Sequence, residues 1–268
     1  MIQLLYQGQW LLFCVILVAL LLSLSFHEFG HAWAAKRCGD DTAQRAGRLT
    51  LNPISHIDPM GLMMVVFIGF GYAKPVPTDP RRFTSRYAEM LVAAAGPAMN
   101  LLLAVITVNV FVQGLHFGWY SPHETLPQSM LFVARINLLL MVFNLLPIGA
   151  LDGHYILPYF LPRQLSQQYR YYNERYGNFA LLGLIALSFL GIPVLQAVWH
   201  ISDVLLPLIV CLHDQFPNTA QRRIRSWQIR TDHNQQHHKR FWRGLIPLRL
   251  QTKPRHSIAI GRCHTIST

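Results

Sequence analysis

The sequence has few charged residues, and several long stretches have none. Charged side chains make up 13% of the 268 residues and apolar ones 52%, whereas soluble domains carry about 25% charged residues. The stretches 1–27, 90–123 and 136–151 contain no Lys, Arg, Asp or Glu. This composition excludes an ordinary soluble enzyme and an intrinsically disordered chain. Because a helix needs about 20 apolar residues to cross the hydrocarbon core of a bilayer, it indicates a polytopic membrane protein.

Paired cysteines and a cleavable leader are also missing. The four cysteines form no C-x-x-C pair, so we predict free thiols and no disulfide framework. No Lys or Arg precedes the first apolar run, and no small-residue cleavage site precedes His27. The first apolar run is therefore expected to be a membrane helix and not a signal peptide.

The net charge of +11 is concentrated at one end of the chain. Residues 217–268 contain 11 of the 23 Lys and Arg residues but only one acid, Asp232. We therefore predict a membrane-embedded core at 9–212 and a basic polar tail at 213–268. Such a tail suits an anionic surface such as acidic lipid or RNA, and a solvated cytoplasmic extension explains it more simply. Anionic lipid is the partner this tail could contact, and no specific nucleic-acid partner is predicted.

The apolar stretches predict an all-α fold with about five transmembrane helices. The first three lie at about 9–36, 88–112 and 129–146. The long apolar stretch 179–212 contains a Gly-Ile-Pro sequence at 191–193 and is interpreted as a hairpin of two more helices. That hairpin returns the basic tail to the side that holds most Lys and Arg residues.

The distribution of Lys and Arg predicts the orientation. Lys36 and Arg37 directly follow the first apolar run, and residues 163–175 contain three arginines, whereas the loop 113–128 has no Lys or Arg. The positive-inside rule then places the first two regions in the cytoplasm and the loop outside. Arg135, near the outer end of the third helix, could snorkel to the interface. We expect an integral protein, of the bacterial inner membrane, with its active site towards the cytoplasm.

Residues 39–87 interrupt the helical pattern. They are rich in Gly, Pro and Asp, with strand-like pieces at 48–51 and 72–76, and the apolar segment 61–71 is too short to cross a bilayer. Backbone at membrane depth must be hydrogen-bonded. We therefore predict a small re-entrant or β-hairpin insertion after the first helix.

The first apolar run ends in an H-E-x-x-H sequence, His27 to His31. Two histidines four apart share one helix face and can bind one zinc ion. Glu28 can then serve as the general base for a zinc-bound water. Ionisable groups within a membrane helix are costly and usually functional. The alternative interpretation is a polar cluster at the helix mouth that faces water.

Catalytic zinc usually has three protein ligands, so a third must come from elsewhere. Asp152 is the leading candidate, because it follows the third helix at the predicted depth of His27 and His31. As an alternative, Asp152 could simply cap the next helix. His154 is a weaker rival. His200 and Asp203 are predicted in the outer half of the membrane, where packing or a water-filled pocket explains them better.

At this point the sequence resembles the site-2 protease family of intramembrane zinc metalloproteases. The resemblance covers about residues 10–160 and rests, besides H-E-x-x-H, on five segments: 39–43 (GDDTA), 47–59 (GRLTLNPISHIDP), 71–77 (GYAKPVP), 95–100 (AGPAMN) and 144–153 (NLLPIGALDG). It implies one zinc ion per chain, bound by His27, His31 and Asp152, with Glu28 activating water. Three more residues fall in family motifs and either orient the substrate and support the oxyanion or make structural hydrogen bonds: His56, Asn100 and Asn144.

The sequence departs from the family pattern in several places. The family usually has two prolines before Leu-Asp-Gly, and Gly149 and Ala150 stand there instead. We expect this exchange to loosen the turn that holds Asp152. No PDZ or CBS regulatory domain is recognised, so a minimal form of the family is expected.

The function predicted is hydrolysis of peptide bonds in or next to transmembrane segments. A helical substrate must unwind before its carbonyl is accessible, and a strand edge at 72–76 could hold the unwound segment. A catalytically silent, protease-like binding protein is the first alternative, although the intact Glu28 disfavours it. An ion or proton transporter is the second, but the inverted repeats typical of transporters are absent from the sequence.

Overall fold

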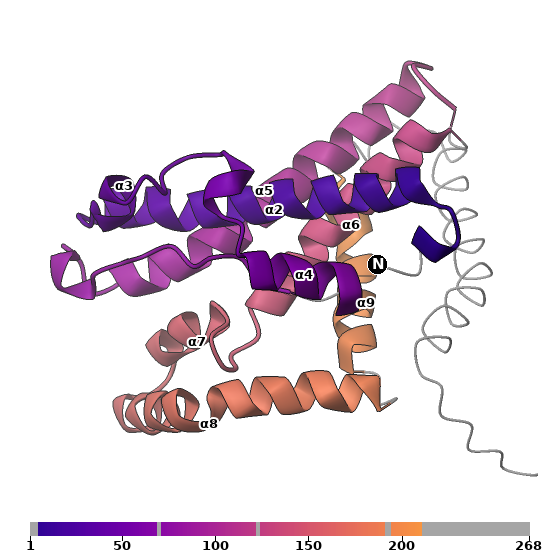
Figure 1. Ribbon diagram of the computed structural model, residues 1–268. Helices are drawn as coiled ribbons and strands as arrows, with labels where there is room; N and C mark the ends of the chain where they lie inside the picture. Colours follow the sequence, from indigo (N-terminus) through magenta and orange to yellow (C-terminus); the bar gives the residue numbers. More distant parts are fainter. Residues whose placement is uncertain (1–4, 69–70, 122–123, 191–193, 211–268) are drawn as a thin grey trace, which may run out of the picture. The chain divides into compact units, whose positions relative to one another are not determined.

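The computed structural model describes residues 5–68, 71–121, 124–190 and 194–210, and within these ranges the chain is helical without any strand (Figure 1). The predicted basic tail and the Gly-Ile-Pro turn at 191–193 lie outside the described residues. Three of the described helices are long and apolar enough to cross a membrane. They agree with the first three predicted spans.

The first of these helices, α2 (Trp10–Arg37), carries the H-E-x-x-H sequence in its second half. Its two serines lie in the apolar part, and both hydroxyls donate to the carbonyl four residues earlier, Ser23 at 2.7 Å and Ser25 at 2.6 Å. No polar side chain therefore needs water there. The helix ends where Gly39 takes a φ of 98°, a conformation that favours glycine.

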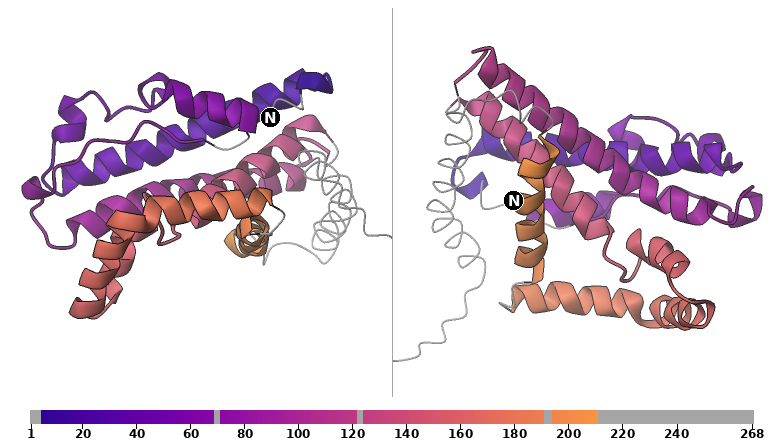
Figure 2. Two further views of the ribbon diagram at one scale, coloured as in Figure 1. Left: turned by 60° about the horizontal axis from the view of Figure 1, so that its bottom comes forward. Right: turned by 180° about the vertical axis from the view of Figure 1, so that it is seen from behind.

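The other two spans are α5 (Ala88–His116) and α6 (Thr125–Asn144). α5 packs against both α2 and α6, so the three helices form one bundle (Figures 1 and 2). At the α2–α5 crossing, a Cβ on Gly30 would lie only 2.7 Å from the carbonyl oxygen of Ala95. The glycine thus lets the two backbones approach closely, which brings the histidine face of α2 onto α5.

Residues 39–87 form short helices joined by extended chain, and the β-hairpins predicted there are not found in the described residues. The elements are α3 (Thr42–Arg45), η1 (Pro53–Ser55), α4 (Pro59–Ile68) and η2 (Pro80–Arg82). The segment 71–79 is extended but does not form a β-ladder. The Lys74 N–H donates a backbone hydrogen bond to the His56 carbonyl at 2.9 Å. Pro75 and Pro77 have no N–H to donate, which explains why a regular strand pair does not form.

The chain after α6 makes a tight turn into α7 (Gly153–Ile156) and η3 (Leu157–Phe160), followed by α8 (Arg163–Phe189), α9 (Val194–Leu205) and η4 (Leu206–Ile209). Neither α8 nor α9 is long and apolar enough to count as a span, so the structure supports three spans and does not confirm the predicted five. α9 packs on α6. There Arg135 is paired with Asp203, with Nε and Oδ1 3.2 Å apart.

Candidate metal centre

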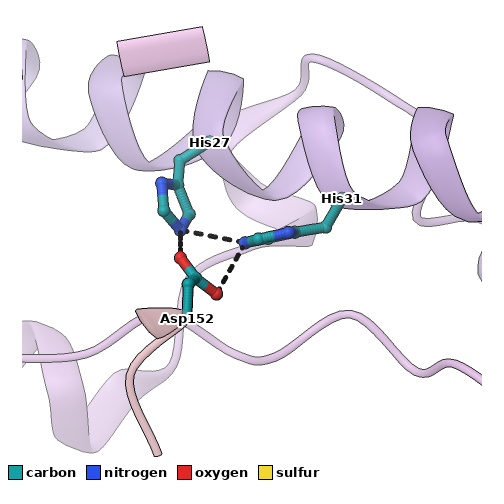
Figure 3. Close-up of side chains that lie close together, drawn as sticks. All are labelled: His27, His31 and Asp152. Carbon is teal, nitrogen blue, oxygen red and sulfur yellow. Dashed lines mark hydrogen bonds and ion pairs between the residues drawn. The ribbon is translucent and has the colours of Figure 1, made fainter. Parts of the chain in front are cut away.

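Three of the predicted site residues converge, although they come from distant parts of the sequence (Figure 3). His27 and His31 point from one face of α2, and Asp152 reaches them from the turn before α7. The two Nε2 atoms are 3.0 Å apart. The carboxylate of Asp152 lies 3.2 Å from Nε2 of His27 and 3.3 Å from Nε2 of His31.

The other ring nitrogen of each histidine is held by an acceptor. Nδ1 of His27 lies 2.7 Å from Oδ1 of Asn100, and Nδ1 of His31 lies 2.7 Å from the Val92 carbonyl. The amide of Asn100 is oriented by its own donation to Oδ1 of Asn137 at 3.0 Å, which leaves its oxygen as the acceptor for His27. Both Nδ1 atoms therefore carry protons, and both Nε2 lone pairs face Asp152.

The cluster has the chemistry and the spacing of a zinc site. Asp152 supplies a carboxylate beside the two imidazole nitrogens, so the cluster offers three donor atoms. Oδ2 of Asp152 has no hydrogen-bond partner of ordinary geometry among the described residues. Bonds of about 2.0–2.1 Å in a tetrahedron put ligand atoms about 3.4 Å apart. The observed separations are close to that value, and two histidines with one carboxylate are a usual donor set for catalytic zinc.

Gly96 provides the space for the two imidazoles. A Cβ at this position in α5 would lie 2.3 Å from Nε2 of His31 and 2.7 Å from Cε1 of His27. Any side chain on residue 96 would thus occupy the volume of the rings. In the sequence, Gly96 belongs to the family segment 95–100, and no role was predicted for it. The signal that could have revealed its role is a glycine within a predicted apolar helix.

Asp152 stands before α7 but does not cap it. Its side chain makes no capping hydrogen bond, and the backbone is helical at this residue. The capping alternative is therefore wrong, and the carboxylate points to the histidines. His154, the weaker rival, packs against the rings of Tyr155 and Tyr169 at 4.7 and 5.6 Å. Burial and the charge of Arg170 lower the pKa of His154.

The remaining predicted residues occupy different places. Glu28 is buried at 9% exposure directly after His27. His56 is 2% exposed, lies 2.8 Å through Nε2 from the Thr50 carbonyl, and lines a cavity of about 20 Å³ between α2 and α4. Asn144 donates to the Leu140 carbonyl in its own helix at 2.9 Å. Of the three residues assigned to substrate positioning, Asn100 alone is found hydrogen-bonded to the cluster in the described chain.

Comparisons with known proteins place the chain among metalloproteases. Residues 15–128 match the family model described as peptidase family M50. The chain is 41% identical to YwhC of Bacillus subtilis over 151 residues. The aligned stretch covers 55% of this chain and 69% of YwhC. It is 34% identical to Rip2 of Mycolicibacterium smegmatis and of Mycobacterium tuberculosis, covering 53% of this chain and 55%, about half, of each relative. All three relatives carry the name "Putative zinc metalloprotease". No solved structure matches the chain significantly.

Proposed function

The chain belongs to peptidase family M50 and is a zinc metalloprotease, and from this premise we propose that it hydrolyses peptide bonds in or next to transmembrane segments of membrane proteins. The observation that carries the proposal is the position of the candidate metal centre. Both histidines belong to a 28-residue helix that is long and apolar enough to cross a membrane. A protease site in such a helix meets substrates that are themselves in the bilayer.

The proposed chemistry divides between the metal ligands and Glu28. A zinc ion held by His27, His31 and Asp152 would polarise the scissile carbonyl and acidify the attacking water. Glu28 then takes the proton of that water on its carboxylate and passes it to the leaving amine. Asn100 and the Val92 carbonyl keep the two imidazoles oriented, because each accepts the proton on Nδ1.

We further propose that the extended segment 71–79 binds the unwound substrate. The Tyr72 carbonyl packs on Gly61 of α4, whereas no backbone–backbone hydrogen bond joins Ala73 or Val76 to another described residue, so these two residues could pair with an added chain. The guanidinium of Arg48 donates to the Lys74 carbonyl and fixes the middle of this segment. The cavity between α2 and α4 is also lined by Tyr72 and Ala73. It provides room for a small apolar side chain next to this edge.

The membrane arrangement proposed here goes beyond the three described spans. The second half of α8 is apolar, and α9 with η4 is a shorter apolar helix. We propose that these two segments pack in the membrane as the hairpin that would complete five spans. In this arrangement the active site faces the cytoplasm of a bacterial inner membrane, and the basic residues beyond 216 contact anionic lipid.

The metal requirement tests this function directly. The purified chain is incubated with a single-span membrane protein substrate, then treated with a chelator and resupplied with Zn²⁺. Cleavage should stop and return, and Asp152→Ala should lose both zinc and cleavage. Asp203→Ala serves as the control, because this acid pairs with Arg135 and lies outside the cluster. Loss of zinc in Asp203→Ala with retention in Asp152→Ala would refute the ligand assignment.

A further inference from the structure

The turn that carries Asp152 is built without the two prolines usual in the family. Gly149 and Ala150 stand in their place. Gly149 takes a φ of 64°, which a proline could not adopt, since its ring fixes φ near −65°. A turn with a glycine at its centre would be mobile unless other groups held it, and an aspartate ligand on a mobile turn would not be kept in place.

Asn173 of α8 supplies the missing restraint. Its Oδ1 accepts the N–H of Gly149 at 2.9 Å, and its Nδ2 donates to the carbonyl of Gly149, also at 2.9 Å. One carboxamide thus pairs with both backbone groups of the turn residue. Tyr169, one helical turn earlier on the same face of α8, donates its hydroxyl to the Pro147 carbonyl at 2.9 Å.

Close packing restricts the contact further. A Cβ on Gly177 would lie 2.4 Å from Oδ1 of Asn173, and a Cβ on Gly149 would lie 3.0 Å from the Gly177 carbonyl. The helix and the turn therefore approach as closely as two glycines permit. α8 is itself tied to the base of α5 by Arg170, whose Nη2 lies 2.9 Å from Oε2 of Glu89.

We propose that Asn173, assisted by Tyr169, is a positioning residue for the metal centre: it fixes the Gly149 turn and thereby holds Asp152 against His27 and His31. The proposal rests on the proposed function insofar as it takes Asp152 as a zinc ligand. Asparagine suits this role because it presents a donor and an acceptor side by side, matching the N–H and the carbonyl of one residue. Both residues lie outside the 15–128 stretch that matches the family model.

The test is the zinc affinity of the full chain in detergent, measured by competition with a chromogenic chelator. Asn173→Asp keeps the size of the side chain but removes the donor and places a negative charge against the Gly149 carbonyl. Its zinc dissociation constant should rise by about 10-fold or more, as is typical for residues that orient ligands. Gln168→Glu is the matched control, because it makes the same amide-to-acid change at an exposed site of α8 and should leave the constant within about 2-fold.

A second readout separates positioning from general stability. With Co²⁺ in place of zinc, the visible spectrum of Asn173→Asp should shift, since the geometry of the Asp152 ligand changes, while Gln168→Glu keeps the native spectrum. Should Asn173→Asp not fold, Tyr169→Phe removes only the hydroxyl on Pro147 and should still raise the dissociation constant by a smaller factor. Native affinity and spectrum in the variants, with Asp152→Ala defective, would overturn the brace alone. Native zinc affinity in Asp152→Ala would instead overturn the ligand set of the proposed function.

Discussion

At the scale of single residues, the site depends on which ring nitrogen carries the proton. Asn100 and the Val92 carbonyl both accept from Nδ1, and this directs the Nε2 lone pairs of His27 and His31 to one point. The two histidines and Glu28 could be predicted from the sequence, because residues four apart share a helix face. The pairing of Asn100 with His27 could not, since 73 residues separate them and only the packing of α5 on α2 brings them together.

Asn100→Ala should weaken zinc binding by about 10- to 100-fold, because His27 then loses the acceptor that fixes its tautomer. Chelator competition measures the change. Asn109→Ala is the control on the same helix: this amide donates to the Ile209 carbonyl, away from the cluster. Its zinc affinity should stay within about 2-fold of the native value. If both variants lost zinc affinity equally, the loss would follow from removing any polar side chain of α5 and not from the contact between Asn100 and His27.

Gly96→Ala should abolish zinc binding, because the added methyl group would overlap the imidazole of His31 at 2.3 Å. Zinc content after purification gives the result. Gly183→Ala is the matched exchange, since a Cβ at this position of α8 meets no atom within 4 Å. That variant should keep full zinc occupancy. A metal-loaded Gly96→Ala protein would mean that the α2–α5 crossing is looser than described.

At the scale of elements, charge-free runs predicted the three long helices well, because a membrane span needs little beyond length and apolarity. The insertion after α2 was predicted less well. The strand-like pieces at 48–51 and 72–76 have suitable residues, but prolines at 75 and 77 prevent a ladder, and the apolar segment between them folds as α4. The pairing of α9 with α6 through Asp203 depends on tertiary contact and was not predicted.

Asp203→Asn should destabilise the chain by about 1–3 kcal/mol, since it leaves Arg135 without its carboxylate in a mostly buried place. Thermal unfolding in detergent measures this loss. Asp41→Asn makes the same exchange in a pair with Arg45 whose side chains are about half exposed, and surface pairs contribute little. Its midpoint should barely change. If the two variants unfold alike, the Arg135–Asp203 pair does not anchor α9.

At the scale of the whole molecule, an apolar helix bundle holds a polar centre near the Lys36 end of α2. The family resemblance and the net charge pattern predicted this arrangement, and the comparisons confirm the family. The turn that holds Asp152 was expected to be loose, yet Asn173 forms hydrogen bonds with both the N–H and the carbonyl of Gly149. That compensation lies 24 residues away in sequence, so no local pattern could reveal it.

The proposed membrane topology predicts which parts of the chain are accessible from outside. In a variant without native cysteines, a cysteine at Ser121, between α5 and α6, should react with an impermeant thiol reagent in intact cells. A cysteine at Ser257 should react only after lysis. The reverse pattern would contradict both the orientation and the five-span arrangement.

The most direct test of the central claim is the exchange Glu28→Gln. Glutamine keeps the size of the side chain but cannot accept the proton of the attacking water, whereas His27, His31 and Asp152 remain as ligands. Zinc content and cleavage of a single-span substrate are measured on the same preparation. We predict native zinc stoichiometry with cleavage reduced by at least about 100-fold. Near-native cleavage by the zinc-loaded Glu28→Gln protein would contradict it.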